Sequence, residues 1–176
     1  SQRLTALLHD ISTLNRMDDA PQETEFCEVD ITQMVATIKS ETALQLAEKD
    51  MTFNNLLPKD LAVKGNQSLL YSVFRNLVDN AIAYAGVGTT IILSAQKEGP
   101  MWHFIFKDNG VGVPREHLPR LFERFYRVDK GRSRKMGGTG LGLAIVKNAV
   151  LLHGGRMSVD NQLSGGLIFD FTLPAC

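Results

Sequence analysis

Two glycine-bracketed stretches hold the residue types that could bind a phosphorylated ligand. The first is DNGVG, at residues 108–112, and the second is GGTGLGL, at residues 137–143. Glycine permits backbone conformations and close approaches that a side chain would block. The second stretch leads into an apolar helical pattern, and a glycine loop at a helix N-terminus presents backbone N–H groups to an anion. Together the two stretches predict a phosphate site.

The second stretch matches neither of two common nucleotide-binding loops. No GxxxxGK[ST] run occurs, which excludes a P-loop. Gly138, Gly140 and Gly142 have GxGxG spacing, but Leu143 stands where the dinucleotide fingerprint needs its third glycine. Taken alone, this stretch is as consistent with an ordinary loop as with a binding loop.

A helix predicted over residues 66–85 carries two asparagines beside its apolar face. Asn66 is a plausible N-cap. At about 100° per residue, Asn80 projects between apolar positions, Asn76 lies beside it, and Tyr84 continues the line one turn on. A buried amide without partners costs about 1–3 kcal/mol. The asparagines are therefore either ligands for a cation or phosphate or an internal hydrogen-bonding pair, and Tyr84 lines the site or belongs to the core.

Asp108 ends an apolar strand and enters a glycine turn. Its carboxylate could accept a hydrogen bond from an exocyclic amine such as that of adenine. Gly110 and Gly112 would let the backbone approach a flat base. The competing interpretation is a turn residue whose side chain bonds to its own backbone.

A basic segment at residues 122–136 lies between the glycine stretches. A charge run is usually a solvated loop, but here glycines surround it, which favours mobile phosphate contacts. Arg127 and Arg132 are the best candidates for those contacts. Phe122 and Phe125 either anchor the segment by packing or are ordinary core residues.

The remaining elements predict an α/β two-layer sandwich. Helices are expected over residues 31–48, capped by Asp30, over 115–123, and over 140–153, which Gly154 ends. Strands are expected at 25–29, 51–57, 61–64, 89–96, 102–107, 156–159 and 167–173. An amphipathic helix at residues 3–18 has no hairpin partner, so a second copy of itself is the simplest partner for its apolar stripe.

Composition excludes several protein classes. The 176 residues hold 19 Lys plus Arg and 19 Asp plus Glu, and this zero net charge argues against a bulk nucleic-acid binder. No apolar run approaches the roughly 18 residues of a membrane span, and no signal peptide is visible. Cys27 and Cys176 have neither metal nor redox spacing, which indicates reduced thiols in a cytoplasmic setting.

Four motifs in order closely resemble the catalytic ATP-binding domain of sensor histidine kinases. They are NLVDNAIAYA, DNGVG, LFERFYRVD and GGTGLGL, and they are similar to that family's N, G1, F and G2 boxes. The resemblance covers about residues 25–174. It implies a mixed, mostly antiparallel sheet covered on one face by helices, the fold shared by histidine kinases, gyrase and heat-shock-chaperone ATPases, with ATP and Mg²⁺ as cofactors.

The resemblance also implies roles for individual residues. Asp108 would select adenine, with Gly110, Gly112 and Tyr84 beside the base. Asn80 would be the magnesium ligand, with Asn76 as a further candidate, and both would be catalytic. The basic segment at residues 122–136 would be the family's flexible lid over the nucleotide. The remaining nucleotide contacts would come from this lid and from the G2 box, at Arg127, Arg132, Gly138, Thr139, Gly140, Leu141, Gly142 and Leu143.

The chain departs from the family pattern at several places. Ala83 stands where a lysine is frequent, and Leu167 and Ile168 stand where threonines are frequent, so no nucleotide contact is assigned to the last two. Residues 1–21 resemble the second helix of the dimerisation domain, and residues 25–176 the catalytic domain. The first dimerisation helix, which carries the phosphoacceptor histidine in the family, is not in this chain, and His9 fits the second helix better than an acceptor motif.

The expected function is transfer of the ATP γ-phosphoryl group to a histidine on that dimerisation domain, for relay to a response regulator. The full-length protein is expected to be a homodimer anchored in the inner membrane, with this part in the cytoplasm. Related ATP-hydrolysing domains carry a glutamate at the position of Asn76, and asparagine cannot act as a general base. An ATPase or serine-kinase relative on the same fold, or a non-catalytic nucleotide-binding module, is the alternative.

Overall fold

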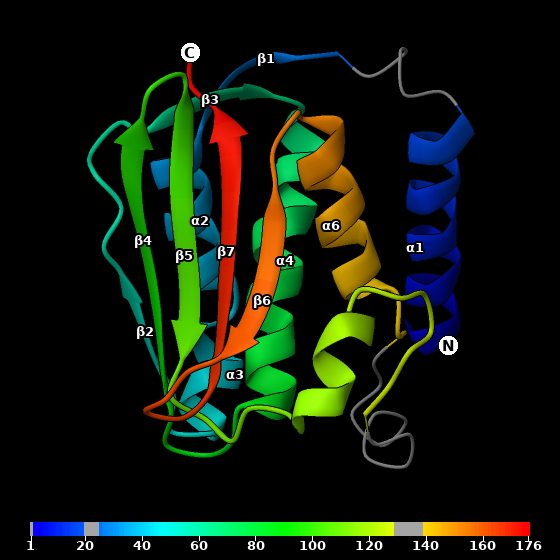
Figure 1. The fold of residues 1–176 in the computed structure, drawn as a ribbon, viewed down its shortest axis with the longest axis vertical. Coiled ribbons are helices and arrows are strands. Elements are labelled where there is room, and N and C mark those ends of the chain that lie inside the picture. The colour runs from blue at the N-terminus through cyan, green and yellow to red at the C-terminus, as the bar shows by residue number, and fades with distance from the viewer. Residues whose placement is uncertain (1, 20–24, 129–138) are drawn as a thin grey trace.

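The computed structural model describes residues 2–19, 25–128 and 139–176. Its centre is a five-stranded sheet with helices on one face (Figure 1). The strand order is β2 (Thr52–Asn55), β4 (Thr90–Glu98), β5 (Met101–Asp108), β7 (Leu167–Pro174) and β6 (Met157–Asn161). Only β2 and β4 pair in parallel, so the sheet is mixed and mostly antiparallel, as predicted.

Helices α4 (Gln67–Tyr84), α6 (Gly142–Leu152), α2 (Ile31–Glu41) and the short α3 (Ala43–Glu48) form the second layer. Alternate residues of the central strands point toward these helices, because successive side chains of a strand face opposite ways. The core is built on aromatic rings, and Phe74 of α4 lies 5.5 Å from Phe104 and 5.7 Å from Phe171 between ring centroids. The predicted two-layer sandwich is confirmed.

A second, two-stranded sheet lies at one end of the molecule, where β1 (Cys27–Asp30) pairs antiparallel with β3 (Ala62–Gly65). Ala175, which follows β7, forms an isolated bridge to Val63 of β3. The chain therefore enters and leaves the sandwich beside the same strand. Cys27 and Cys176 are both exposed and both free thiols.

Two predicted helices differ from the observed ones. The helix expected over residues 31–48 breaks at Thr42, which is fully buried and whose hydroxyl donates to the Ile38 carbonyl (2.8 Å). A threonine hydroxyl that bonds to the carbonyl four residues earlier bends a helix. The helix expected over 115–123 is a 3₁₀ helix, η2 (Arg115–Arg120), with Pro119 inside it. Asp30 and Asn66 do cap α2 and α4 as predicted, accepting from Gln33 N–H and Leu69 N–H.

Helix α1 (Gln2–Asp19) lies against α6 of its own chain (Figure 1). Leu14 and Met17 are buried there, whereas Leu4 and Leu8 remain 55% and 60% exposed. The expectation that a second copy covers the apolar stripe was therefore wrong for Leu14 and Met17, because the sandwich itself covers them. Among the described residues, no helix is both long and apolar enough to cross a membrane.

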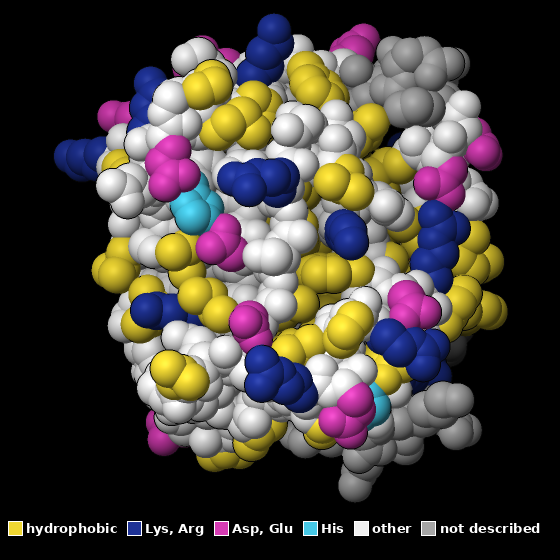
Figure 2. Space-filling view, viewed as in Figure 1, with side chains coloured by type: hydrophobic (Ala, Val, Ile, Leu, Met, Phe, Trp, Pro, Cys, Tyr) yellow, Lys and Arg dark blue, Asp and Glu magenta, His cyan; other side chains and the backbone are white. Residues whose placement is uncertain are grey.

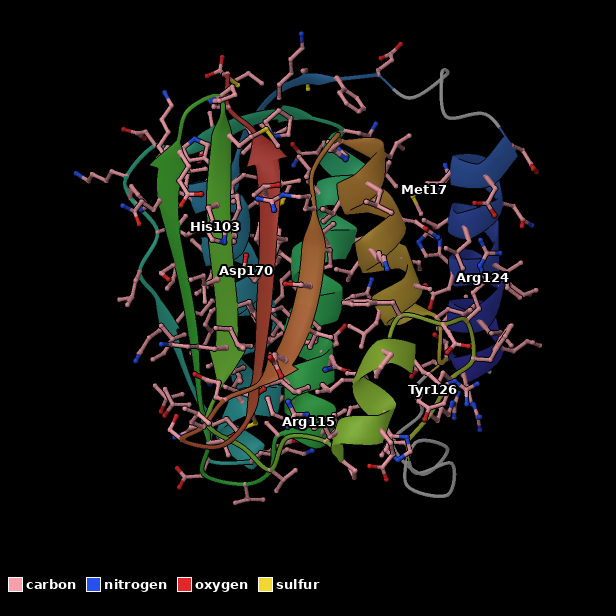
Figure 3. The ribbon with its side chains drawn as sticks, viewed as in Figure 1. Met17, His103, Arg115, Arg124, Tyr126 and Asp170 are labelled. Atoms are coloured by element: carbon pink, nitrogen blue, oxygen red, sulfur yellow. The ribbon has the colours of Figure 1, made fainter. Side chains whose placement is uncertain are left out.

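Positive and negative side chains are interspersed on the outer face of the sheet, in keeping with the zero net charge (Figure 2). His103 lies on this face between the carboxylates of Asp170 and Glu98 and is hydrogen-bonded to Asp170 (Figure 3). Although burial lowers the pKa of His103, its hydrogen bonds to Asp170 and Glu98 outweigh that effect and raise it.

Candidate nucleotide-binding site

Asp108 ends β5 at the bottom of a pocket between α4 and the sheet. Its side chain is buried, and one carboxylate oxygen accepts from the backbone N–H groups of Gly110 (2.9 Å) and Leu167 (3.4 Å). Burial raises the pKa of Asp108, and these two hydrogen bonds oppose the rise. A carboxylate held in this way keeps acceptor capacity for a ligand.

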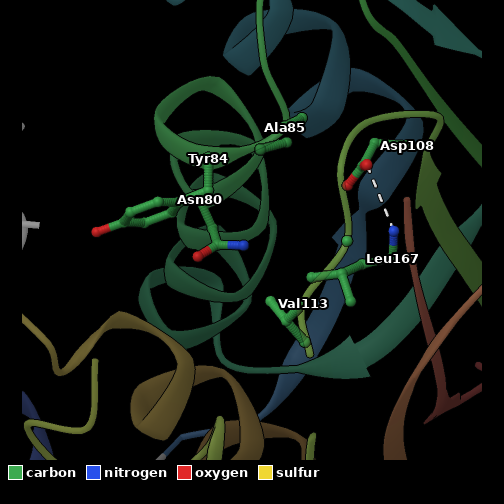
Figure 4. A pocket seen from close by; sticks show the side chains of 8 residues that line it. Asn80, Tyr84, Ala85, Asp108, Val113 and Leu167 are labelled. Atoms are coloured by element: carbon green, nitrogen blue, oxygen red, sulfur yellow. Dashed lines mark hydrogen bonds between the residues drawn. The ribbon is translucent and has the colours of Figure 1, made fainter. Parts of the chain in front are cut away.

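The pocket brings together residues that are distant in the sequence (Figure 4). Asn80 and Tyr84 come from α4, Gly112 from the loop after β5, and Asp108 from the strand end, as the family resemblance implies. The cavity measures about 20 Å³, which is roughly the space of one water molecule and also of an exocyclic amine. Its full lining is Asn80, Ala81, Tyr84, Ala85, Asp108, Gly112, Val113 and Leu167.

The loop over residues 109–114, here called the G1 loop, is pressed against the end of α4. A Cβ atom at Gly110 would lie 2.2 Å from the Ala85 carbonyl oxygen, so only glycine fits there. The Val111 N–H donates to the same carbonyl (3.2 Å). The glycine at position 110 is therefore required by packing between loop and helix, before any ligand is considered.

Asn76 lies where α4 meets the start of α6. Its amide nitrogen donates to the Ser72 carbonyl (2.8 Å), and its oxygen would be 2.8 Å from a Cβ atom at Gly142, the first residue of α6. The two predicted catalytic asparagines thus lie on one side of α4. Asn76 is next to the N-terminus of α6, and Asn80 lines the pocket.

The described part of the G2 box forms the entry into α6. Gly140 has φ +78°, in the left-handed region that favours glycine, and the Leu141 N–H donates to the Thr139 hydroxyl (3.1 Å). Leu141 is buried, while Gly142 and Leu143 begin the helix. The backbone N–H groups of this first helical turn are the ones that an anion can use.

The start of the lid is hydrogen-bonded to the G2 box. Arg127 lies beside Gly140, where an added Cβ atom would be 3.1 Å from its Nε atom, and the Phe125 N–H donates to the Gly140 carbonyl (2.8 Å). Phe122 packs against Phe169 as expected, with ring centroids 6.2 Å apart. The prediction for Phe125 was wrong, because it is 57% exposed and has φ +64°. Arg132 and Gly138 lie outside the described residues.

Helix α1 also reaches the candidate site. The Thr139 hydroxyl donates to the carboxylate of Asp10 (2.7 Å), and Arg124 forms an ion pair with Asp18 (2.6 Å; Figure 3). Leu14 and Met17 make the apolar part of this contact. These contacts could not be predicted from the sequence, because the pattern of an amphipathic helix does not specify which surface it covers.

Asn161, the last residue of β6, and Gln162, which follows it, were not predicted as site residues. Asn161 hydrogen-bonds to the backbone of the G1 loop, and Gln162 to the backbone of Asp108. Only their place before the turn residues SGG could have drawn attention to them.

The chemistry of the site suits a hard cation held together with phosphates. No group of three His, Cys, Asp or Glu side chains that could hold a metal occurs within the described residues. Mg²⁺ uses oxygen ligands and retains waters while bridging substrate phosphates. The carboxamide oxygens of Asn80 and Asn76 are ligands of that kind, so these residues fit the ion that the fold implies.

Comparison with known proteins agrees with this arrangement. Residues 65–176 match the family described as histidine kinase-, DNA gyrase B-, and HSP90-like ATPase. The chain is 34% identical over 174 residues to the sensor-like histidine kinase SenX3 of Mycolicibacterium smegmatis, which covers 99% of this chain and 45% of SenX3. It is 32% identical over 176 residues to the sensor histidine kinase WalK of Bacillus subtilis, covering 99% of this chain and 29% of WalK. The chain thus spans less than half the length of these relatives.

Solved structures show the same fold. The mycobacterial sensor histidine kinase MprB superposes with a TM-score of 0.71 at 28% identity, covering 85% of this chain and 97% of that one. The catalytic domain of the histidine kinase ThkA gives a TM-score of 0.75 at 24% identity, covering 86% and 96%. Full-length ShkA, solved in complex with AMPPNP, gives 0.82 at 24% identity, covering 98% and 36%.

Proposed function

This chain belongs to the family of histidine kinase-, DNA gyrase B- and HSP90-like ATPases and carries the ATP-binding catalytic domain of a sensor histidine kinase, and we propose that within the longer protein it transfers the ATP γ-phosphoryl group to a histidine. The observation that carries the proposal is the meeting of Asp108, Asn80 and Tyr84 in one pocket, with Asn76 at the start of α6.

In this proposal, Asp108 accepts a hydrogen bond from the adenine amine, which discriminates against guanine because guanine presents a carbonyl there. Tyr84 and the G1 loop enclose the base. The backbone N–H groups at the start of α6 bind the phosphates, with Arg127 beside them. Asn80 would hold Mg²⁺, with Asn76 as a further candidate, and the ion when bound neutralises phosphate charge.

Asn76 supports a kinase over an ATPase. A carboxamide cannot take a proton from water near neutral pH, so this position provides no general base. Phosphoryl transfer then depends on positioning and charge neutralisation, and the nucleophile comes from elsewhere. We assign that role to a histidine on the first dimerisation helix, which this chain does not include.

We propose the same division of the chain as the sequence predicts. Residues 1–21 form the second helix of the dimerisation domain, and residues 25–176 the catalytic domain. Leu4 and Leu8, exposed on α1, are suited to pack in a dimeric helical bundle. In the longer protein we expect a homodimer, an inner-membrane anchor, a cytoplasmic catalytic part and a response-regulator receiver domain as partner. The solved complex of ThkA with its response regulator TrrA offers a precedent for that partner.

Calorimetry with ATP, GTP and a non-hydrolysable ATP analogue, with and without Mg²⁺, tests the nucleotide site. We expect ATP to bind, GTP to bind more weakly, and Mg²⁺ to strengthen triphosphate binding. A folded chain that binds no nucleotide would refute the proposal.

Labelled ATP tests the direction of transfer. The chain alone should not become phosphorylated, whereas an added dimerisation segment with its histidine should acquire acid-labile phosphate. Acid-labile phosphate on this chain that disappears in His9→Gln would instead identify His9 as the acceptor. Rapid release of inorganic phosphate by the chain alone would favour the ATPase alternative.

A further inference from the structure

We propose that Asn161 and Gln162, at the end of β6, are positioning residues that hold the base pocket ready for adenine. We call these two side chains the hairpin latch, because they belong to the β6–β7 hairpin and fasten it to the G1 loop. The inference rests on the proposed function, since it takes Asp108 as the residue that recognises the base.

Asn161 holds both main-chain polar groups of Val113, a residue that lines the pocket. Its Oδ1 atom accepts from the Val113 N–H (3.0 Å), and its Nδ2 atom donates to the Val113 carbonyl (2.7 Å). The paired bonds hold the peptide groups on both sides of Val113. Asn161 therefore determines where the G1 loop lies relative to β6.

Gln162 acts at the opposite end of the same loop. Its Nε2 atom donates to the carbonyl oxygen of Asp108 (2.6 Å), while its own N–H donates to the Gly166 carbonyl (2.8 Å) and its carbonyl accepts from Gly165 N–H (3.1 Å). One residue thus connects the hairpin turn to the backbone that carries the base-recognising carboxylate. Next to it, the Leu167 N–H donates to that carboxylate directly.

Two glycines, Gly112 and Gly166, allow the close packing around the latch. A Cβ atom at Gly112 would lie 2.6 Å from Oδ1 of Asn161, and one at Gly166 would lie 2.0 Å from the Asp108 carbonyl oxygen. Both glycines have positive φ angles, +66° and +88°. Gly112, which the family resemblance assigns to the nucleotide, is thus also needed for the contact between the loop and Asn161.

The latch should act on the base and not on the phosphates. It contacts Asp108 and Val113, and within the part of the chain that the structure describes its side-chain hydrogen bonds do not reach Asn76, Asn80 or the start of α6. A loop that is ordered before binding spares the ligand the cost of ordering it. Loss of the latch should therefore weaken every ligand that carries adenine and reduce the preference for ATP over GTP.

The test uses Asn161→Ala, which removes both bonds to Val113, and Gln162→Glu, which keeps the length of the side chain but cannot donate to Asp108. Asn55→Ala is the matched control, because Asn55 also accepts from a loop N–H, that of Leu57 (3.1 Å), on edge strand β2 away from the pocket. Calorimetry measures ATP and GTP, an NMR titration measures adenosine, and thermal unfolding confirms that each variant is folded.

We expect each latch variant to lower the affinity for ATP and the affinity for adenosine by the same factor. This factor should be about tenfold, which corresponds to one well-made hydrogen bond. GTP affinity should change less, and Asn55→Ala should bind like the wild type. Unchanged ATP and adenosine affinity in folded latch variants, or an equal loss in Asn55→Ala, would overturn the latch while the proposed function stands. A wild-type chain that binds no nucleotide would refute the proposed function itself.

Discussion

At the scale of single residues, Asp108 is placed where binding and stability conflict. Burial makes the charged carboxylate unfavourable, and this raises its pKa. A group whose pKa is raised by folding stabilises the fold below its unfolded pKa, and that contribution is lost as the pH rises through the folded pKa. At neutral pH the empty protein therefore carries an unfavourable buried charge.

Asp108→Asn should relieve this cost. The amide oxygen can still accept from Gly110 and Leu167, but no charge is buried. We expect the free energy of unfolding at pH 7 to rise by about 1 kcal/mol, which raises Tm by about 2–4 °C in a domain of this size. The gain should shrink toward the acidic pH at which the wild-type carboxyl protonates.

The same substitution should weaken the binding of ATP by about 1.5–3 kcal/mol, because a hydrogen bond to a charged group is lost. Calorimetry and thermal unfolding of both proteins at several pH values measure the two effects. A less stable Asp108→Asn protein with wild-type ATP affinity would contradict both parts of this prediction.

His153 makes contacts at the end of α6 that we expect to be sensitive to acid. Its Nδ1–H donates to the Ala149 carbonyl (2.7 Å), its Nε2 accepts from the Asn66 N–H (3.0 Å), and its ring stacks on Phe26. Burial lowers the pKa of His153. The neutral ring therefore makes its full contribution to the free energy of unfolding above pH about 6.5, the pKa of histidine in the unfolded chain. This contribution is lost as the pH falls from that value to the lower pKa of the folded state.

His153→Phe keeps a ring for stacking but leaves the Asn66 N–H without its acceptor, which costs about 1–3 kcal/mol. The difference in Tm between wild type and variant should be largest at pH 8 and should narrow below pH 6.5. His103→Gln is the matched control, because the raised pKa of His103 predicts a difference that narrows as the pH rises. A difference that is constant from pH 8 to 5 would exclude a buried neutral His153.

Site residues that belong to a sequence motif could be predicted. Residues that contact the motif from a distant part of the chain could not. Asp108, Asn80 and Tyr84 were predicted from strand end and helix face, and the structure brings them to one pocket. Asn161 is 48 residues from Val113, so its contact depends on β7 pairing with β5, which brings the β6–β7 hairpin beside the loop after β5. No local pattern contains that pairing.

At the scale of elements, α1 is held to the sandwich through one face only. Leu14 and Met17 are buried there, and the polar contacts that α1 makes to the rest of the described chain include Asp10 to Thr139 and Asp18 to Arg124. In proteins most of the stability of a helix comes from the tertiary packing of its amphipathic face. The order of α1 therefore depends on this contact.

Leu14→Ala should release α1 without unfolding the sandwich. Truncating a buried leucine costs about 2–5 kcal/mol, and here the loss should appear as faster amide exchange across α1 alone. Leu8→Ala makes the same change on the exposed face of the same helix and should leave exchange nearly unchanged. Equal exchange in the two variants, or loss of protection in the sheet as well, would show that α1 is not a separately docked element.

The type of nearly every element was predictable, because hydrophobic period, caps and glycine turns are local signals. The exceptions have tertiary or stereochemical causes. The helix expected over residues 31–48 is interrupted at the buried Thr42, whose hydroxyl bonds to the Ile38 carbonyl, and Pro119 lies in a 3₁₀ turn where a longer helix was expected. The contact between α1 and α6 was not predictable, since an apolar stripe does not specify its partner.

At the scale of the whole molecule, nucleotide should stabilise the fold by mass action. A ligand at a hundred times its Kd adds about 2.7 kcal/mol, or about 5–10 °C in Tm for a chain of this size. We expect ATP with Mg²⁺ to give this shift and removal of Mg²⁺ by EDTA to reduce it. Asn80→Ala should abolish the effect of EDTA while adenosine still binds. If EDTA lowers the ATP-dependent shift equally in wild type and variant, Asn80 is not the ligand.

Both ends of the sandwich meet at β3, through the β1–β3 pair and the Val63–Ala175 bridge. The Asp108 end of β5 is distant from them, because Met101 at the other end of this eight-residue strand pairs with Pro174, and such a strand spans roughly 25 Å. Segments joined at either end of the sandwich would therefore lie on the side of the molecule opposite the pocket. A mechanical pull on its two ends would act first on the small β1–β3 sheet, far from the nucleotide.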